Sequence, residues 1–237
     1  MILAGLLVSS DPKLYFQCTA EIFSKLMFGF FVGCALTEFL APKLGQRIQT
    51  HVTEPKKYAQ EIKGSAATIF VLSLIAAWPY QMTRQGKPTA FCDTFEESLI
   101  FGSYILFGVK MVFITLAADA WTYFKHRSLH HPSIYAFHKE HHTFYDPSTY
   151  AGFSLHPVES LYTFCPIWLF CIPGLQIYAP VHIPFLLSWS ALNFYLHCGY
   201  YVPVLENIMP YFFINTSAFH NIHHEKTVTH FGEMVRL

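Results

Sequence analysis

The 237-residue sequence is long enough for one domain with a substantial core, but its composition is unusual for a soluble protein. Apolar residues make up 53% of the chain and charged residues 13%, whereas about a quarter of the residues in a soluble domain are charged. The formal net charge is +0, which gives no support for a nucleic-acid-binding surface. The composition therefore indicates a protein that lies in a lipid membrane.

The first two expected membrane helices span 22–41 and 65–82. Each is close to the length of about 20 apolar residues that a bilayer crossing requires. Lys25 and Glu38 lie near the ends of the first segment, where their charged groups can extend to the interface. The second segment is uncharged and closes with aromatic residues, which is typical of a membrane–water interface.

Two further apolar regions follow. Thr94 and Glu97 have the spacing of a capping box and predict that a third helix begins near residue 98 and runs to about 118. The region 160–205 contains no Asp, Glu, Lys or Arg, but prolines and a glycine interrupt its middle. It predicts a hairpin of two helices. The expected fold is therefore all-α, with about four to five transmembrane or re-entrant helices.

The distribution of charge predicts how these helices are oriented. The segment 43–64 holds five basic residues, whereas 83–97 holds two basic and three acidic ones. The positive-inside rule places the first of these loops in the cytosol. Counting the crossings then places 119–159 and 206–237 in the cytosol as well, as a cap on one membrane face.

Three histidine-rich motifs, HRSLH, HKEHH and HNIHH, all fall in this cap. On a helix, residues three and four positions apart share one face, so each motif can present its imidazoles together. The three motifs supply His126 and His130; His138, His141 and His142; and His220, His223 and His224. A lone histidine is usually an ordinary surface or core residue, but eight clustered imidazoles can enclose two metal ions, since one ion needs three or four ligands. Imidazole suits zinc, copper, iron and nickel, so the motifs alone leave the metal open.

The stretches DAWTYFKHRSLHHPSIYAFHKEHH, LHPVE, LHCGYYVP and NTSAFHNIHHEKTVTHFGE resemble the histidine boxes of the fatty acid hydroxylase superfamily. This superfamily comprises membrane-bound di-iron enzymes, among them sterol desaturases, methyl-sterol oxidases and sphingoid-base hydroxylases. The resemblance implies that the eight histidines and a ninth, His197, bind two irons, with zinc as an alternative occupant of the isolated protein. It also implies an integrated domain, in which 1–97 forms membrane helices and a cytosolic loop and 98–237 forms the catalytic region.

The same resemblance implies an enzyme of the endoplasmic reticulum membrane with its histidine boxes facing the cytosol. It would use O2 to hydroxylate or desaturate a lipid, which could be a fatty acyl chain, a sphingoid base or a sterol. Electrons would come from a cytochrome b5-type donor or its reductase as a separate partner, because the sequence holds no haem- or flavin-binding motif.

Four residues near the boxes are candidates for hydrogen-bonding the outer nitrogen of a ligand imidazole: Asp119, Tyr123, His156 and Glu159. Two other functions stay open. A metal transporter would place its ligands at mid-membrane on the spanning helices, whereas the boxes here follow the predicted spans. A non-catalytic scaffold could use the same histidines to hold structural zinc.

Overall fold

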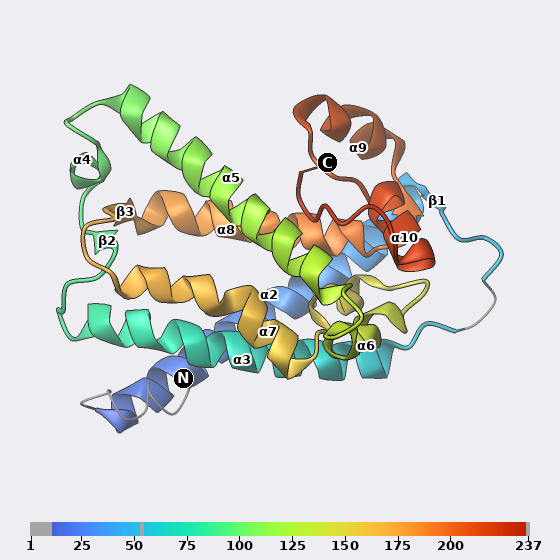
Figure 1. Cartoon of the computed structure of the whole chain (residues 1–237), viewed down its shortest axis with the longest axis horizontal. Helices are drawn as coiled ribbons and strands as arrows, with labels where there is room; N and C mark the ends of the chain where they lie inside the picture. Colours follow the sequence, from blue (N-terminus) through green and yellow to red (C-terminus); the bar gives the residue numbers. More distant parts are fainter. Residues whose placement is uncertain (1–10, 53–54, 236–237) are drawn as a thin grey trace.

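The computed structural model describes residues 11–52 and 55–235 and is mainly helical. Four long helices run between two ends of the molecule (Figure 1). They are α2 (Pro12–Leu44), α3 (Tyr58–Arg84), α5 (Tyr104–Leu129) and α8 (Ala179–Leu196). The predicted all-α class is confirmed.

Short elements connect these helices at the two ends. The short α-helices are α4 (Phe95–Ser98), α6 (Lys139–His142), α7 (Pro157–Phe164), α9 (Pro203–Ile208) and α10 (Ser217–Lys226). The 3-10 helices are η1 (Tyr135–Phe137), η2 (Thr149–Phe153), η3 (Cys165–Cys171) and η4 (Met209–Phe212). Two-residue strands pair β1 (Gln46–Arg47) with β4 (Tyr200–Tyr201) antiparallel, and β2 (Phe91–Cys92) with β3 (Ile177–Tyr178) parallel.

Within the described part of the chain, α2, α3 and α5 are long and apolar enough to cross a membrane. Large apolar side chains remain exposed along them, among them Phe28 on α2 and Phe113 on α5, at 74% and 70% exposure. Burying such groups away from water is favourable, and lipid tails provide that environment around a spanning helix. The chain is therefore an integral membrane protein, as its composition predicted.

The third long helix begins later than predicted. Thr94 does cap a helix, because its side chain accepts a hydrogen bond from the amide of Glu97 at 3.3 Å. That helix, α4, ends after four residues, and the backbone turns through left-handed conformations at Phe101 and Gly102. Ser103 then caps α5, which ends at Leu129. Compared with the predicted helix from near 98 to about 118, α5 is therefore shifted along the chain toward the histidine boxes.

The uncharged region 160–205 forms the expected hairpin. One arm consists of α7 followed by η3, and the other is α8. Gly174, with φ of 94°, lies in the turn between them, where a residue with a Cβ would be strained. Residues 11–52 and 55–235 thus contain three potential spanning helices and one hairpin, where the sequence predicted about four to five transmembrane or re-entrant helices.

The core forms where α2, α3 and α8 meet. Phe30, Cys34, Ile69 and Phe194 make one buried cluster. A Cβ on Gly33 would overlap the ring of Phe194, so glycine is needed for α2 and α8 to approach this closely. This contact fixes α8, which carries His197 at its C-terminal end.

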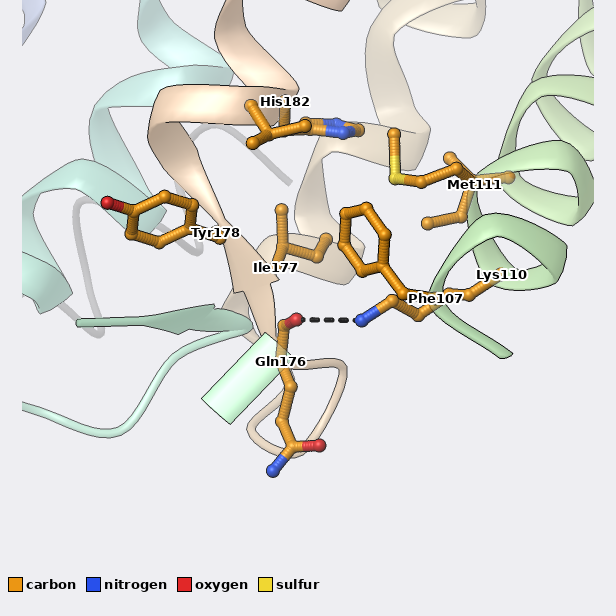
Figure 2. Close-up of a pocket in the computed structure, with 9 residues that line it drawn as sticks. Phe107, Lys110, Met111, Gln176, Ile177, Tyr178 and His182 are labelled. Carbon is orange, nitrogen blue, oxygen red and sulfur yellow. Dashed lines mark hydrogen bonds between the residues drawn. The ribbon is translucent and has the colours of Figure 1, made fainter. Parts of the chain in front are cut away.

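At the end of the bundle away from the histidines, Lys110 connects α5 to the turn that precedes β3. Its ammonium donates to the carbonyl of Gln176 at 3.0 Å (Figure 2). It also donates to the carbonyl of Ser98. The small pocket drawn there is lined mostly by apolar side chains and by His182. Sixteen residues of helix separate Lys110 from His126, about 24 Å along α5, so this pocket is remote from the histidine boxes.

The basic loop after α2 lies against the histidine-bearing segments. Lys56 forms an ion pair with Asp146 at 3.0 Å, and the Gln49 amide donates to the Asn221 side chain at 2.8 Å. The loop and the histidine groups therefore share one end of the bundle, at the right of Figure 1. Which side of the membrane this end faces stays a prediction.

Candidate metal centre

The structure brings all nine predicted histidines together in two groups. Within each group, one nitrogen of every imidazole lies within 4.8 Å of the others. The five-histidine group consists of His126, His130, His138, His142 and His223, and the four-histidine group of His141, His197, His220 and His224. Seven of the nine side chains are buried, His142 lies at the limit with 9% exposure, and His130 is partly buried. That they bind metal stays a prediction.

A single shared helix face would place all three imidazoles of a box in one group. The HKEHH and HNIHH boxes are instead each divided between the two groups. In HKEHH, His138 and His142 join the five-histidine group while His141 joins the other. Successive residues point about 100° apart around a helix, whereas residues four apart differ by about 40°. The pair at i and i+4 therefore stays together, and the residue at i+3 reaches the neighbouring group.

The HNIHH box on α10 repeats this division in reverse. His220 and His224, four residues apart, belong to the four-histidine group, whereas His223 belongs to the five-histidine group. Each of these two boxes consequently contributes to both groups, which places the groups side by side. Between the groups, the ring centroids of His142 and His224 lie 5.1 Å apart and those of His138 and His141 lie 5.4 Å apart.

Distances between facing Nε2 atoms match those between ligands of one ion. His142 Nε2 lies 3.2 Å from His130 Nε2 and 3.0 Å from His138 Nε2. In the other group, His197 Nε2 lies 3.0 Å from His220 Nε2 and 3.4 Å from His141 Nε2. Two nitrogens each bound about 2.1 Å from an ion, at right angles or tetrahedrally, are separated by about 3.0–3.4 Å.

The outer nitrogens of several of these imidazoles are held by the protein. A ring that donates its Nδ1 proton keeps the Nε2 lone pair available for a metal. The Nδ1 contacts are His126 to the Phe231 carbonyl (3.0 Å), His223 to the Thr229 carbonyl (2.7 Å), His138 to Glu159 (2.8 Å), His141 to the Ser154 carbonyl (3.3 Å) and His197 to the Asn193 carbonyl (2.9 Å).

Some inward nitrogens are buried without a hydrogen-bond partner in the described structure. They include Nε2 of His126, Nε2 of His223 and both ring nitrogens of His224. A buried polar atom without a partner is costly and uncommon in proteins. A bound ion would give these lone pairs a partner, so the residues present fit two metal ions.

Burial also keeps these imidazoles neutral, as metal ligands must be. It lowers the pKa of His130, His197 and His223 to about 4. The pKa values of His138 and His142 are lowered further, by burial and then by the neighbouring histidines. At neutral pH the groups therefore present lone pairs instead of positive charges.

The C-terminal strap, residues 229–235, closes over the five-histidine group. Besides orienting His126 and His223 through its carbonyls, it carries Glu233, which pairs with Lys125 at 2.8 Å. Lys125 is only 3% exposed. No sequence motif predicted this strap. The one visible signal was Lys125, a lysine directly before a box histidine on a mainly apolar helix.

Of the four residues expected to orient an imidazole, the structure places Glu159 in such a contact. Asp119 accepts instead from the amide of Val235 at 3.0 Å, because it points toward the strap. The hydroxyl of Tyr123 accepts from Arg127 on the same helix. His156 caps α7 by accepting from the Val158 amide at 3.2 Å. In the described structure these three residues make contacts other than the expected one to a box imidazole.

Comparison with known proteins places the site in a family. A model of the fatty acid hydroxylase family matches residues 111–237, which include all nine histidines. A Δ7-sterol 5(6)-desaturase of Aspergillus fumigatus is 29% identical over 200 residues, covering 80% of this chain and 52% of that protein. Sphinganine C4-monooxygenase 1 of Arabidopsis thaliana is 30% identical over 128 residues, covering 52% and 47%.

Methylsterol monooxygenase 1 of Danio rerio is 30% identical over 120 residues, covering 48% of this chain and 39% of that protein. The chain thus spans about half the length of the curated relatives it matches, or less. No solved structure matches it.

Proposed function

Because the chain belongs to the fatty acid hydroxylase family, we propose that it is a membrane-bound oxygenase that hydroxylates or desaturates a lipid. The observation that carries this proposal is the pair of adjacent imidazole groups at one end of a bundle of apolar helices. Iron bound there would supply the activation of dioxygen. The nine histidines, His126, His130, His138, His141, His142, His197, His220, His223 and His224, would hold two such ions.

The protein's own part is to keep the imidazoles neutral, oriented and close to lipid. Burial favours the neutral rings, and the contacts of their Nδ1 atoms fix which nitrogen faces inward. His126 lies on the last turn of α5, whose outer surface is apolar. A lipid lying along that helix could therefore bring a carbon atom near the centre without leaving the bilayer.

The relatives' names support a lipid substrate, since they refer to a sterol, to sphinganine and to a methylsterol. We keep three substrate classes within the proposal: a fatty acyl chain, a sphingoid base and a sterol. We further propose that the enzyme resides in the endoplasmic reticulum membrane, with the histidine end in the cytosol. Electrons would come from a cytochrome b5-type donor or its reductase, docking near the basic loop after α2.

The first test is the metal content of the detergent-purified chain after expression with iron supplied, measured by elemental mass spectrometry. About two irons per chain are expected, with a loss in both His141→Ala and His223→Ala. His51→Ala is the matched control, because His51 is exposed and lies outside both groups. A single tightly held zinc, or unchanged metal in both variants, would contradict the di-iron centre and favour a zinc scaffold.

The second test asks for turnover. Cells or membranes that contain the chain should yield a hydroxylated or newly unsaturated lipid that disappears without oxygen and in His223→Ala. An iron-loaded protein that gives no oxygen-dependent lipid product, even with a cytochrome b5-type donor and its reductase supplied, would contradict the enzymatic function while leaving the metal centre intact.

A further inference from the structure

We propose that the two metal positions differ in affinity and that the five-histidine group is the tighter position and fills first. This inference rests on the two-metal centre proposed above. It concerns a property of the individual positions that the nine histidines by themselves do not determine.

The first difference between the groups is their contact with acidic side chains. Glu159 accepts from Nδ1 of His138 at 2.8 Å, and Glu233 lies 3.6 Å from Nδ1 of His126. Both of these imidazoles belong to the five-histidine group. Across residues 11–52 and 55–235, no other carboxylate forms such an ion pair with a histidine.

The outer contacts of the four-histidine group go to neutral main-chain atoms. His141 donates to the Ser154 carbonyl, and His197 to the Asn193 carbonyl. A carboxylate acceptor makes an imidazole a better electron donor to a metal than a carbonyl does. It also lowers the energy of a nearby dication by direct attraction.

The balance of charge around the five-histidine group is negative when both acids are ionised. Lys125 pairs with Glu233 at 2.8 Å and offsets that carboxylate. Glu159 is fully buried at 0% exposure, and its Oε2 atom has no hydrogen-bond partner in the described structure. A dication in the five-histidine group would attract this carboxylate, whereas among the described residues no carboxylate forms an ion pair with an imidazole of the four-histidine group.

The second difference is how firmly the imidazoles are held before metal binds. In the five-histidine group, Glu159 and the two strap carbonyls fix His138, His126 and His223, and the ring of Phe231 packs 5.0 Å from that of His130. In the four-histidine group, both ring nitrogens of His224 lack a hydrogen-bond partner in the described structure. Ligands that are already oriented lose less freedom on binding, which increases affinity.

Titration of the metal-free full-length chain in detergent with Co2+ tests this inference. Equilibrium dialysis gives the two binding constants, and visible absorption reports the surroundings of each ion. We expect two distinct binding phases. The tight phase should survive in His141→Ala, which damages the four-histidine group, and should be lost in His223→Ala, which damages the five-histidine group.

Two conservative variants then test the cause. Glu159→Gln and Glu233→Gln should each weaken the tight phase by about 10- to 100-fold while leaving the weak phase unchanged. Glu61→Gln is the matched control, because Glu61 is equally buried at 1% exposure but contacts Ser148 and no imidazole. Two separate glutamine variants are used so that a folding defect in one leaves the other informative.

The possible results separate this inference from the proposed function. Two Co2+ ions with equal affinity, a tight phase lost in His141→Ala, or glutamine variants that bind like the wild type would overturn the inequivalence and leave the two-metal centre standing. Failure of the folded wild-type chain to bind two ions would overturn the centre itself, and the inference with it.

Discussion

Mild acid should destabilise the metal-free protein through its clustered histidines. Burial lowers the pKa of His130, His197 and His223 to about 4 in the folded protein, whereas an unfolded histidine has a pKa of about 6.5. The unfolded chain therefore binds more protons than the folded one between these two values. The stabilisation is fully present above about pH 6.5 and is lost as the pH falls toward about 4.

The size of the effect follows from these pKa values. Consider one histidine whose pKa is about 6.5 in the unfolded chain and about 4 in the folded protein. Lowering the pH from about 7.5 to about 5.5 then reduces the free energy of unfolding by about 1.4 kcal/mol. These three groups alone cost about 4 kcal/mol if they titrate independently, and His138 and His142, whose pKa values are lowered further, add to this loss. For a chain of this size the fall in the thermal midpoint is therefore at least about 10 °C.

The assay is thermal unfolding of chelator-treated protein in detergent, followed by tryptophan fluorescence at both pH values. His197→Gln removes one of the three histidines and should reduce the acid-induced loss of stability by about 1.4 kcal/mol. His51→Gln should leave it unchanged, because His51 is exposed and lies outside both groups. A metal-free midpoint that moves by less than about 2 °C between these pH values would refute the reasoning.

Three substitutions test other contacts. Gly64→Ala would drive a Cβ into the side chain of Ser154, and the main-chain carbonyl of Ser154 accepts from Nδ1 of His141. We expect a loss of about 1–3 kcal/mol in stability and weaker metal binding. The control Gly29→Ala, where the added Cβ would meet no atom within 4 Å, should change neither measurement. His156→Ala should lower stability by about 1 kcal/mol, because it removes the cap of α7, without changing the metal content. A loss of metal in this variant would show that His156 orients a metal-binding imidazole. Lys110→Met should lower the thermal midpoint through its lost carbonyl contacts, and unchanged stability would show that these contacts do not stabilise α5.

The sequence predicted that the histidines of the three boxes lie together, because residue type and helical spacing are local properties. The spacing of His138 and His142 brings them into one group, as a helix face requires. It could not predict that the intervening His141 belongs to the neighbouring group. That division depends on where α8 and α10 lie, which is a matter of tertiary packing.

Local signals also explain the errors. The capping box at Thr94 was correct, but the left-handed turn at Phe101 and Gly102 interrupts the helix that it begins. The strap was missed because main-chain carbonyls, such as that of Phe231, have no signature in a sequence. Asp119 was assigned to an imidazole because it lies near a box, but its direction on α5 leads to the strap amide instead.

The spacing of the histidines along the chain has a consequence for biosynthesis. The first and last of them, His126 and His224, are separated by about 100 residues, which a ribosome adds in roughly 5–20 s. During that interval the early imidazoles are already synthesised while their partners on α10 are not. Neither metal position can be complete until α10 has returned to the end of the bundle where α5 finishes. If the two groups bind ions as proposed, the complete ligand sets form only after the helices are inserted, and a cell short of metal would accumulate an inserted but unloaded chain.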